Sequence, residues 1–245
     1  MSLPANLFIG PSGWSYPHWK DRFFAGVPRR KWLTYCAGTF NGVEVNASYY
    51  RFLAPTTYAK WRAETPEDFA FALKGHKTIT HSKRLKDAGE MVQRFRGSVS
   101  DLGERLHVIL WQLPPNMTRN DARLDSFCRV LDGWPQVRHV IEFRHDSWFN
   151  AEIADLLDAH NVANCISDSG RWPRWDAVTG GLAYIRLHGN DPTYASAYGE
   201  QGLRPWADRI KGWHGDGRPV HVYFDNDAEG AAPYDAMTLT GLCSR

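Results

Sequence analysis

Short β-prone runs alternate along the chain with segments that carry helix-start and helix-stop residues. The eight expected strands are Leu7–Ser12, Gly42–Asn46, Phe69–Lys74, His107–Gln112, Arg138–Arg144, Val162–Ser167, Ala183–His188 and Val220–Asn226. The expected helices are Pro28–Phe40, Thr57–Ala63, Ala88–Arg105, Asp121–Leu131, Ser147–Ala159, Leu203–Trp213 and Ala231–Leu242. Ser147 is the expected N-cap of its helix. Strands that alternate with helices in this way indicate a parallel sheet.

Eight such strands in 245 residues predict an α/β fold of the (β/α)8 TIM-barrel type, whose usual length is about 250 residues. We expect residues 1–245 to form a single domain, because no repeat or linker divides the chain. Pro173 and two glycines near the end of the connection Asp168–Gly181 predict a loop there, with at most a short helix. A doubly wound sheet is less favoured, because Gly10-Pro-Ser-Gly13 lacks the GxGxxG spacing.

Polar residues fall at the carboxyl ends of most of the expected strands. Side chains alternate between the two faces of a strand, so Val43 and Val45 on one face place Glu44 and Asn46 on the other. The same alternation directs five further polar residues into the barrel: Lys74, Glu142, Arg144, Arg186 and His188. Ser12, Gln112 and Asn226 occupy comparable strand ends. Catalytic groups of such barrels lie at this end.

The inward set predicts a cavity with three cations and two carboxylates, which favours a small anionic substrate. The candidate catalytic residues are Glu142 and Glu44, each of which could act as general acid or base, His188 as a proton shuttle, and Lys74 as a second cation or an imine-forming amine. The candidate substrate-binding residues are Arg144, Arg186, Asn46, Gln112, Asn226, Trp14 and Tyr50. Buried ion pairs that only fill the barrel, and a core role for His188, stay open as alternatives.

No cofactor is predicted. The sequence has no HExxH, HxH or paired-cysteine pattern that would indicate a transition-metal site. A single Mg²⁺ held by Glu44, Glu142 or Asp168 stays open, because such sites need few protein ligands. The connection after the first strand is long and rich in aromatic residues, and more aromatic residues follow later strands. Interleaved with arginines, they leave a nucleic-acid-binding rim open as an alternative, although they could also simply anchor their loops.

Composition narrows these choices further. Apolar residues make up 43% of the chain and charged residues 23%, which is typical of a globular protein. The net charge is only +2, so the sequence carries no strong signal for nucleic acid or an anionic membrane as partner. Four dispersed cysteines, and no recognisable signal peptide or membrane span, predict a cytoplasmic protein.

Several motifs occur in one order across nearly the whole chain. They are Ser12-Gly-Trp14, Val43-Glu-Val-Asn46 through Tyr50-Arg51, Phe69-Ala-Phe-Ala-Leu-Lys74, Thr80-His81, Gln112-Leu-Pro-Pro115, Glu142-Phe-Arg-His-Asp-Ser-Trp148, Arg186-Leu-His-Gly189 and Tyr223-Phe-Asp-Asn-Asp227. In this respect the chain resembles the YecE-like proteins, domain of unknown function 72. Pro11 stands where that family usually has Thr, and Asp225 where it usually has Asn.

The resemblance implies a TIM-type barrel in a bacterial cytosol, and it supplies no reaction. The barrel of this family has been likened to that of metal-dependent DNA-repair endonucleases, which implies a metal-assisted phosphodiester hydrolase as an alternative. The sequence lacks the corresponding histidine–carboxylate cluster. We therefore expect acid/base chemistry on a small molecule that carries a phosphate or carboxylate group. This substrate class includes sugar-like molecules.

Overall fold

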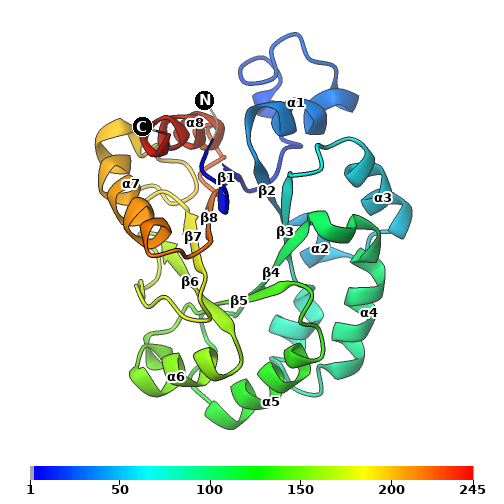
Figure 1. Cartoon of the computed structure of the whole chain (residues 1–245), viewed down its shortest axis with the longest axis vertical. Helices are drawn as coiled ribbons and strands as arrows, with labels where there is room; N and C mark the ends of the chain where they lie inside the picture. The colour runs from blue at the N-terminus through cyan, green and yellow to red at the C-terminus, as the bar shows by residue number, and fades with distance from the viewer. Residues whose placement is uncertain (1–2, 245) are drawn as a thin grey trace.

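Eight parallel strands form a nearly closed barrel in the computed structural model, which describes residues 3–244 (Figure 1). The strands are β1 (Leu7–Pro11), β2 (Gly42–Val45), β3 (Ala70–Lys74), β4 (Leu106–Gln112), β5 (Arg138–Glu142), β6 (Val162–Asp168), β7 (Ala183–Leu187) and β8 (Val220–Phe224). Their order in the sheet is β1-β8-β7-β6-β5-β4-β3-β2, with every pair parallel. The predicted barrel is confirmed.

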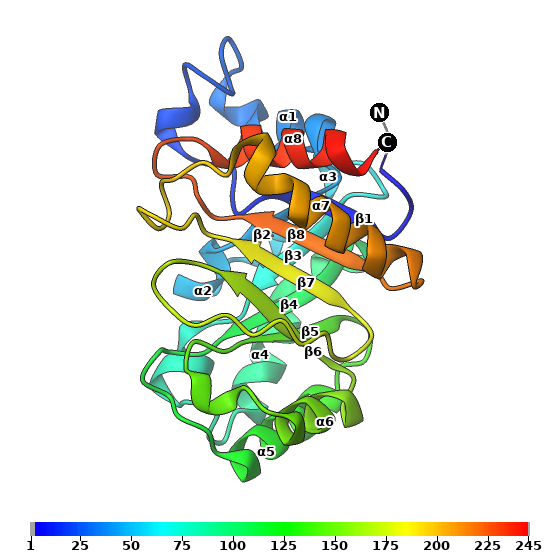
Figure 2. The ribbon, with the colours of Figure 1, turned by 90° about the vertical axis from the view of Figure 1, so that its left-hand side faces the viewer.

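Helices surround the strands, and the view of Figure 2 shows the strands running side by side within this shell. The α-helices are α1 (Trp32–Thr39), α2 (Ala47–Tyr50), α3 (Pro55–Ala63), α4 (Gly89–Val99), α5 (Asp121–Asp132), α6 (Ala151–Ala159), α7 (Gly199–Gly215) and α8 (Ala232–Cys243). The tighter or wider turns are η1 (Pro17–Trp19), η2 (Arg29–Lys31), η3 (Thr78–Ser82), η4 (Ser100–Arg105) and η5 (Asp146–Trp148). The described chain forms no helix between β6 and β7, as the loop prediction expected. None of its helices combines the length and the apolar character that a membrane span requires.

The barrel closes where β1 meets β2. A Cβ atom on Gly10 would stand 1.9 Å from the carbonyl oxygen of Gly42, so a residue with a side chain does not fit there. The Asn41 side chain joins the two strands: its Nδ2 donates to the Leu7 carbonyl at 2.7 Å, and its Oδ1 accepts from the Ile9 amide at 3.0 Å. This side chain replaces ladder hydrogen bonds at the seam.

Two of the predicted helices differ from the structure at one end, one near a glycine and the other at its N-cap residue. The expected helix Ala88–Arg105 divides into α4 and η4, and Gly103, with a φ of 57°, breaks the helical backbone inside η4. The predicted N-cap at Ser147 is wrong. Asn150 caps α6 instead, since its side chain accepts the backbone N–H of the third helical residue at 3.0 Å.

Apolar side chains fill much of the barrel interior, above a group of rings formed by Phe8, His107 and His221 at the amino ends of the strands. They alternate along the strands with outward-facing residues that pack under the helices, which is the alternation the sequence predicted. The interior cluster comprises Ala72, Val108, Leu110, Val140, Ala163, Cys165, Leu182, Tyr184 and Tyr223. Nearer the carboxyl ends of the strands, polar side chains line the interior instead.

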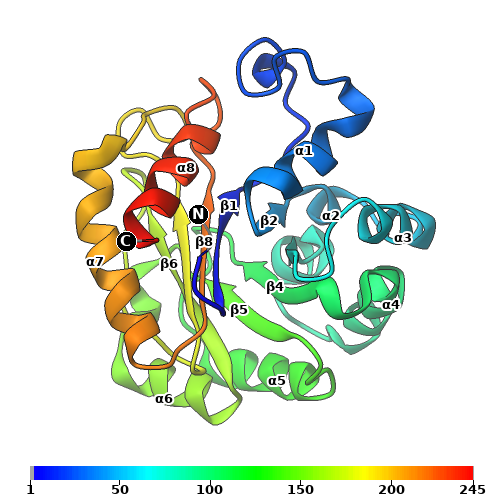
Figure 3. The same cartoon turned by 45° about the horizontal axis from the view of Figure 1, so that its top comes forward.

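The long loop after β1 is held together largely by its own aromatic residues. Trp19 and Phe24 are buried, and Phe24 stacks on Trp32 of α1 with ring centroids 4.5 Å apart and planes within 6° of parallel. Figure 3 shows this part of the chain projecting beyond the barrel. Most of these rings therefore anchor the loop, which is the simpler of the two roles left open by the sequence.

Candidate functional site

Arg186 is the centre of a charged cluster buried inside the barrel. Its Nη2 lies 2.7 Å from Glu44 Oε1 and 3.0 Å from Asp225 Oδ2, and its Nη1 lies 2.9 Å from Glu142 Oε2. Its Nε donates to Glu44 and its Nη1 also contacts His188 at 3.3 Å. These contacts occupy all five N–H groups of the guanidinium, and the side chain is fully buried. Arg186 therefore has no donor left for a substrate anion, unlike the role the sequence predicted.

Glu44 is held by four donors beneath the mouth of the barrel. Besides Arg186, the Ser12 hydroxyl donates to its Oε1 at 2.5 Å and the Tyr184 hydroxyl to its Oε2 at 2.6 Å. Asn46 continues this chain by donating from Nδ2 to the Ser12 hydroxyl at 2.9 Å. Glu44 is fully buried, so it acts here as a counter-ion for Arg186 and does not face the mouth.

Glu142 is the second buried carboxylate. Its Oε1 accepts from Arg144 Nε at 2.9 Å and from the Ser167 hydroxyl at 3.1 Å. Burial alone would raise the pKa of this carboxyl, but Arg144 and Arg186 outweigh it and hold the pKa well below its usual range. Glu142 is therefore ionised at neutral pH, which is unfavourable for a general acid; its role as a base stays a prediction.

Asp225 supplies a third carboxylate, and the predicted surplus of cations inside the barrel is therefore wrong. It follows β8, where the alternation places Tyr223 and Asp225 on the inner face and Asn226 on the outer one. Asn226 donates instead to Asp235 of α8 at 2.8 Å and to the Ser196 carbonyl at 3.0 Å. It anchors loops and takes no part in the inward cluster.

His188 lies at the edge of the cluster and is fully buried. Its Nδ1 is 3.0 Å from Asp225 Oδ2, although the angle is poor for a hydrogen bond. Burial and the Arg186 charge lower its pKa, so the ring is neutral at pH 7. Trp172 and Tyr194 pack edge-on against it, with centroids 5.0 and 5.5 Å away. A proton-shuttle role for His188 stays a prediction.

Lys74 ends β3 at the mouth of the barrel and is partly exposed. Its Nζ lies 4.6 Å from the centroid of the Tyr49 ring, and among residues 3–244 no carboxylate lies within 4 Å of it. Burial and the Arg186 charge lower its pKa to about 8. Roughly a tenth of the amine is then neutral at pH 7.

Arg144 lies beside Lys74, and we call the two residues the mouth cations. The Arg144 guanidinium stacks over the Trp172 ring at 3.8 Å, which holds it in place above Glu142. His81, on η3, packs against Tyr49 with ring centroids 5.2 Å apart. Burial and the mouth cations lower the pKa of His81 to about 4, so this ring is also neutral at pH 7.

The remaining predicted residues divide between the mouth and other surroundings. Gln112 is buried and donates to the Leu113 carbonyl at 2.8 Å. Tyr50 is 65% exposed. Asp168 turns outward, where Arg174 donates to it at 3.0 Å and the Tyr198 hydroxyl at 2.8 Å. Trp14 and Asn46 line a groove beside the mouth.

The His, Cys, Asp and Glu side chains of the described residues give little support for a metal site. Within residues 3–244 no group of three or more His, Cys, Asp and Glu side chains is placed to hold an ion. Of the three carboxylates considered for Mg²⁺, Glu44 and Glu142 already accept from arginine and hydroxyl donors, and Asp168 belongs to a different side of the sheet. The three therefore do not share a site.

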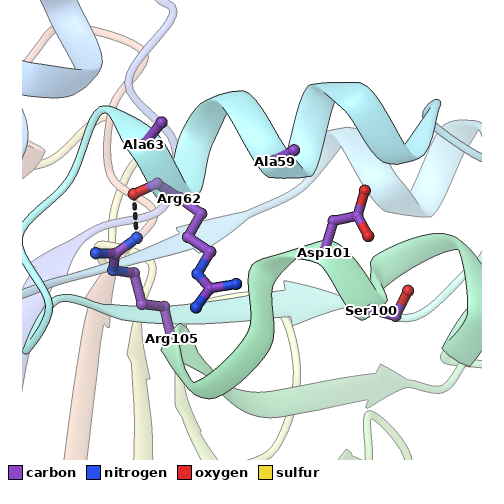
Figure 4. Close-up of a pocket in the computed structure, with 6 residues that line it drawn as sticks. All are labelled: Ala59, Arg62, Ala63, Ser100, Asp101 and Arg105. Carbon is purple, nitrogen blue, oxygen red and sulfur yellow. Dashed lines mark hydrogen bonds between the residues drawn. The ribbon is translucent and has the colours of Figure 1, made fainter.

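A separate groove of about 490 Å³ lies between α3 and η4 (Figure 4). Arg62 and Arg105 line it, and Arg105 donates to the Arg62 carbonyl and, at 2.8 Å, to that of Pro66. Arg105 directly precedes the first residue of β4, so this groove lies at the amino end of the strands. It is remote from the end where barrels place their chemistry.

Several residues of the mouth were missed by the sequence reasoning. Asp225 and Ser167 lie on the inner face of β8 and β6, and strict alternation along those strands would have found them. Tyr49 and His81 lie on α2 and η3, two short elements that no periodic pattern announces. The motifs Val43–Arg51 and Thr80-His81 were their only signals.

The fold and its polar carboxyl end define a (β/α)8-barrel protein with a charged site at the mouth. Residues 8–245 match the family described as protein of unknown function DUF72, and the chain belongs to that family.

Curated relatives agree with this assignment. The protein is 31% identical to the UPF0759 protein YecE of Escherichia coli (strain K12) over 144 residues, which are 58% of this chain and 50% of YecE. The match thus spans about half the length of that relative. It is 23% identical to the UPF0759 protein YunF of Bacillus subtilis (strain 168), with 96% of this chain and 94% of YunF covered.

Two solved structures of DUF72 family proteins share the fold. The protein from Thermotoga maritima has a TM-score of 0.80 at 24% identity, with 98% of this chain and 99% of that chain covered. The protein from Enterococcus faecalis has a TM-score of 0.83 at 18% identity, with 98% and 96% covered. At these identities the likeness concerns the fold alone.

Proposed function

We propose that this protein is an enzyme that acts on a small anionic carbonyl compound at the carboxyl end of its barrel, with Lys74 as the nucleophile. The single observation that carries the proposal is the contrast in pairing at the mouth. Arg186 and Arg144 are bonded to carboxylates, whereas no carboxylate in residues 3–244 lies within 4 Å of the Lys74 amine. An unpaired, partly buried amine among cations is the usual arrangement of an imine-forming lysine.

The reaction begins with the neutral form of Lys74, which burial and Arg186 favour by lowering its pKa to about 8. The amine nitrogen adds to the carbonyl carbon and gives a carbinolamine. This intermediate loses the former carbonyl oxygen as water, and both original N–H protons leave with that water or through solvent. The resulting imine, once protonated, withdraws electrons from the neighbouring carbon.

The anionic group of the substrate would bind at Arg144. The Nε atom of Arg144 is bonded to Glu142, and the stacking of the guanidinium on Trp172 fixes its plane. Its two terminal nitrogens are not hydrogen-bonded to any group in residues 3–244, so they can donate together to a carboxylate or phosphate.

The buried carboxylates take a supporting role in this proposal. Glu142 and Asp225 stay ionised and fix Arg144 and Arg186, which in turn keep the pKa of Lys74 low. Proton transfer falls to His81, which is neutral at pH 7 and packs against the same Tyr49 ring as Lys74. This arrangement replaces the direct acid/base role expected for Glu142 and Glu44.

Borohydride trapping tests the proposal. The protein would be incubated with a panel of small oxo acids and sugar phosphates, reduced with borohydride and examined by intact and peptide mass spectrometry. We expect an adduct on Lys74 that is absent in Lys74→Met and retained in Lys77→Met, an exposed neighbour that serves as control. An adduct that persists in Lys74→Met would refute the role of Lys74.

A further inference from the structure

A second groove, of about 370 Å³, lies beside the mouth between the loop after β1 and the helices α2 and α3. Its lining residues are Gly13, Trp14, Ser15, Tyr16, Val45, Asn46, Ala47, Arg51 and Trp61. Neither Lys74 nor Arg144 is among them, although α2 lines the groove through Ala47 and contacts Lys74 through Tyr49. The groove is therefore next to the mouth but formed by different side chains.

Asn46, one of the lining residues, carries a buried acceptor without a donor. Asn46 Nδ2 is bonded to the Ser12 hydroxyl, whereas its Oδ1 is buried and has no hydrogen-bond partner within residues 3–244. Leaving a buried carbonyl oxygen unpaired is costly, so such atoms usually have a partner in the functional state. The missing partner must be an N–H or O–H donor.

The walls of the groove are aromatic. Trp14 and Trp61 meet edge-to-face with ring centroids 5.0 Å apart. Of the hydroxyls in the lining, that of Tyr16 already donates to the Ser12 carbonyl at 2.6 Å, and that of Ser15 accepts from Arg29 Nη2 at 3.5 Å. A sugar ring would leave several of its hydroxyls unpaired against these walls, whereas a planar heterocycle needs few polar partners and offers its face to an indole.

Arg51 adds a cation to the rim. Its side chain is exposed, and no carboxylate in the described part of the chain lies within 4 Å of it. An arginine in this position can bind a phosphate bidentately or stack on a base. The groove thus offers an apolar slot, one acceptor and one unpaired cation to the same ligand.

We infer that this groove binds a nucleoside monophosphate, with the base stacked on one face of the tryptophan pair, a base N–H donating to Asn46 Oδ1 and the phosphate on Arg51. Each of the four common bases carries such an N–H group. The inference goes beyond the proposed function, because the site makes no use of Lys74.

Isothermal titration calorimetry with AMP, GMP, CMP and UMP tests this inference. We expect at least one of them to bind, and ribose 5-phosphate, which lacks the base, to bind at least about tenfold more weakly. Inorganic phosphate and the free nucleoside separate the contributions of the anion and of the ring. Failure of all four nucleotides to bind, or equal binding of ribose 5-phosphate, would overturn the inference.

Variants locate the site. Arg51→Ala is an exposed change that should leave the fold intact and weaken nucleotide binding by about tenfold. Asn46→Leu should weaken it by about fivefold while keeping a similar shape. Arg30→Ala, an exposed arginine outside the groove, is the matched control and should bind as the natural protein does. Unchanged affinity in Arg51→Ala and Asn46→Leu would place the nucleotide elsewhere.

The same titration in Lys74→Met keeps the two proposals apart. Nucleotide binding should survive in Lys74→Met, whether or not Lys74 forms an imine. Loss of nucleotide binding in this variant would contradict the independence of the groove, whereas failed borohydride trapping with intact nucleotide binding would reject only the proposed reaction.

Discussion

Arg186 and Lys74 are two cations inside one barrel with opposite surroundings. Arg186 is fully buried and gives all its N–H groups to protein acceptors, three of them carboxylates. Lys74 ends β3 and is partly exposed, beside the Tyr49 ring and other cations. Glu142 and Asp225 are near it, but neither carboxylate is within 4 Å of the amine. Arg186 is thus a charge that organises the barrel, whereas Lys74 is one that is left reactive. From the sequence alone, both residues are predicted at similar inward positions.

The difference arises from the partners that each charge has gained on burial. A buried charge is tolerated when it is paired and hydrogen-bonded, as Arg186 is. Lys74 has lost hydration without gaining a carboxylate, and its protonated form is disfavoured as a result. Removing Arg186 should therefore lower the stability of the protein, whereas removing Lys74 should not.

Arg186→Met should give the largest loss of stability. It would leave three carboxylates buried without their shared cation, at a cost of about 3–5 kcal/mol in the free energy of unfolding. Urea denaturation followed by circular dichroism measures this loss. Lys74→Met, the matched change at the mouth, should be as stable as the natural protein or more so. Equal destabilisation by both changes would remove the distinction between the two cations.

Glu142→Gln should come next, because it keeps the shape of the side chain but removes a buried negative charge between Arg144 and Arg186. We expect a loss of about 2–4 kcal/mol in the same denaturation experiment. Glu200→Gln, which breaks the exposed pair between Glu200 and Arg204, should leave stability almost unchanged. A small effect of Glu142→Gln would mean that the cluster is more hydrated than its contacts indicate.

The pH dependence of stability should differ between the two regions. The pKa values of Glu142 and Asp225 lie below their ordinary values of 4.5 and 3.8, so the stability they contribute is present above about pH 4.5 and lost as the pH falls. The pKa of Lys74 falls from 10.5 to about 8 on folding. The unfolded chain then binds more protons between these values, and stability should rise with pH in that window.

Urea midpoints measured across pH for the natural protein, Glu142→Gln and Lys74→Met check these signs. The acid-induced loss should shrink in Glu142→Gln, and the alkaline gain attributable to the lysine should disappear in Lys74→Met. Three parallel curves would contradict both assignments.

Arg144→Lys should have the smallest effect of the series. The lysine keeps the charge but loses the planar stacking on Trp172 and the paired donors, so stability should fall by roughly 1 kcal/mol. Trapping efficiency at low substrate concentration should fall by about tenfold through weaker binding. Unchanged concentration dependence would show that Arg144 does not bind the anion.

Much of this arrangement could be predicted from the sequence, because alternation along a strand is a strict geometric rule. It placed Glu44, Lys74, Glu142 and Arg186 on the inner face, and the structure brings them together. The rule was not applied through the end of β8, where it would have selected Asp225 over Asn226. That one-residue difference changed the predicted charge of the interior.

Other features depend on tertiary contacts that no single-strand pattern contains. The saturation of Arg186 requires side chains from β2, β5 and the end of β8 at once. The short helix α2 and the turn η3 are stabilised by contacts such as that of the Ser48 hydroxyl with the Lys74 carbonyl at 2.8 Å. Sequence periodicity cannot announce elements of four or five residues.

The central claim is that the Lys74 amine is unpaired and loses its proton near neutral pH. Heteronuclear NMR titration of the lysine side chains, with Lys74→Met to assign the signal, measures this pKa directly. We predict a value of about 8 for Lys74, against 10.5 for an ordinary lysine. A Lys74 signal that titrates with the exposed lysines would contradict the account.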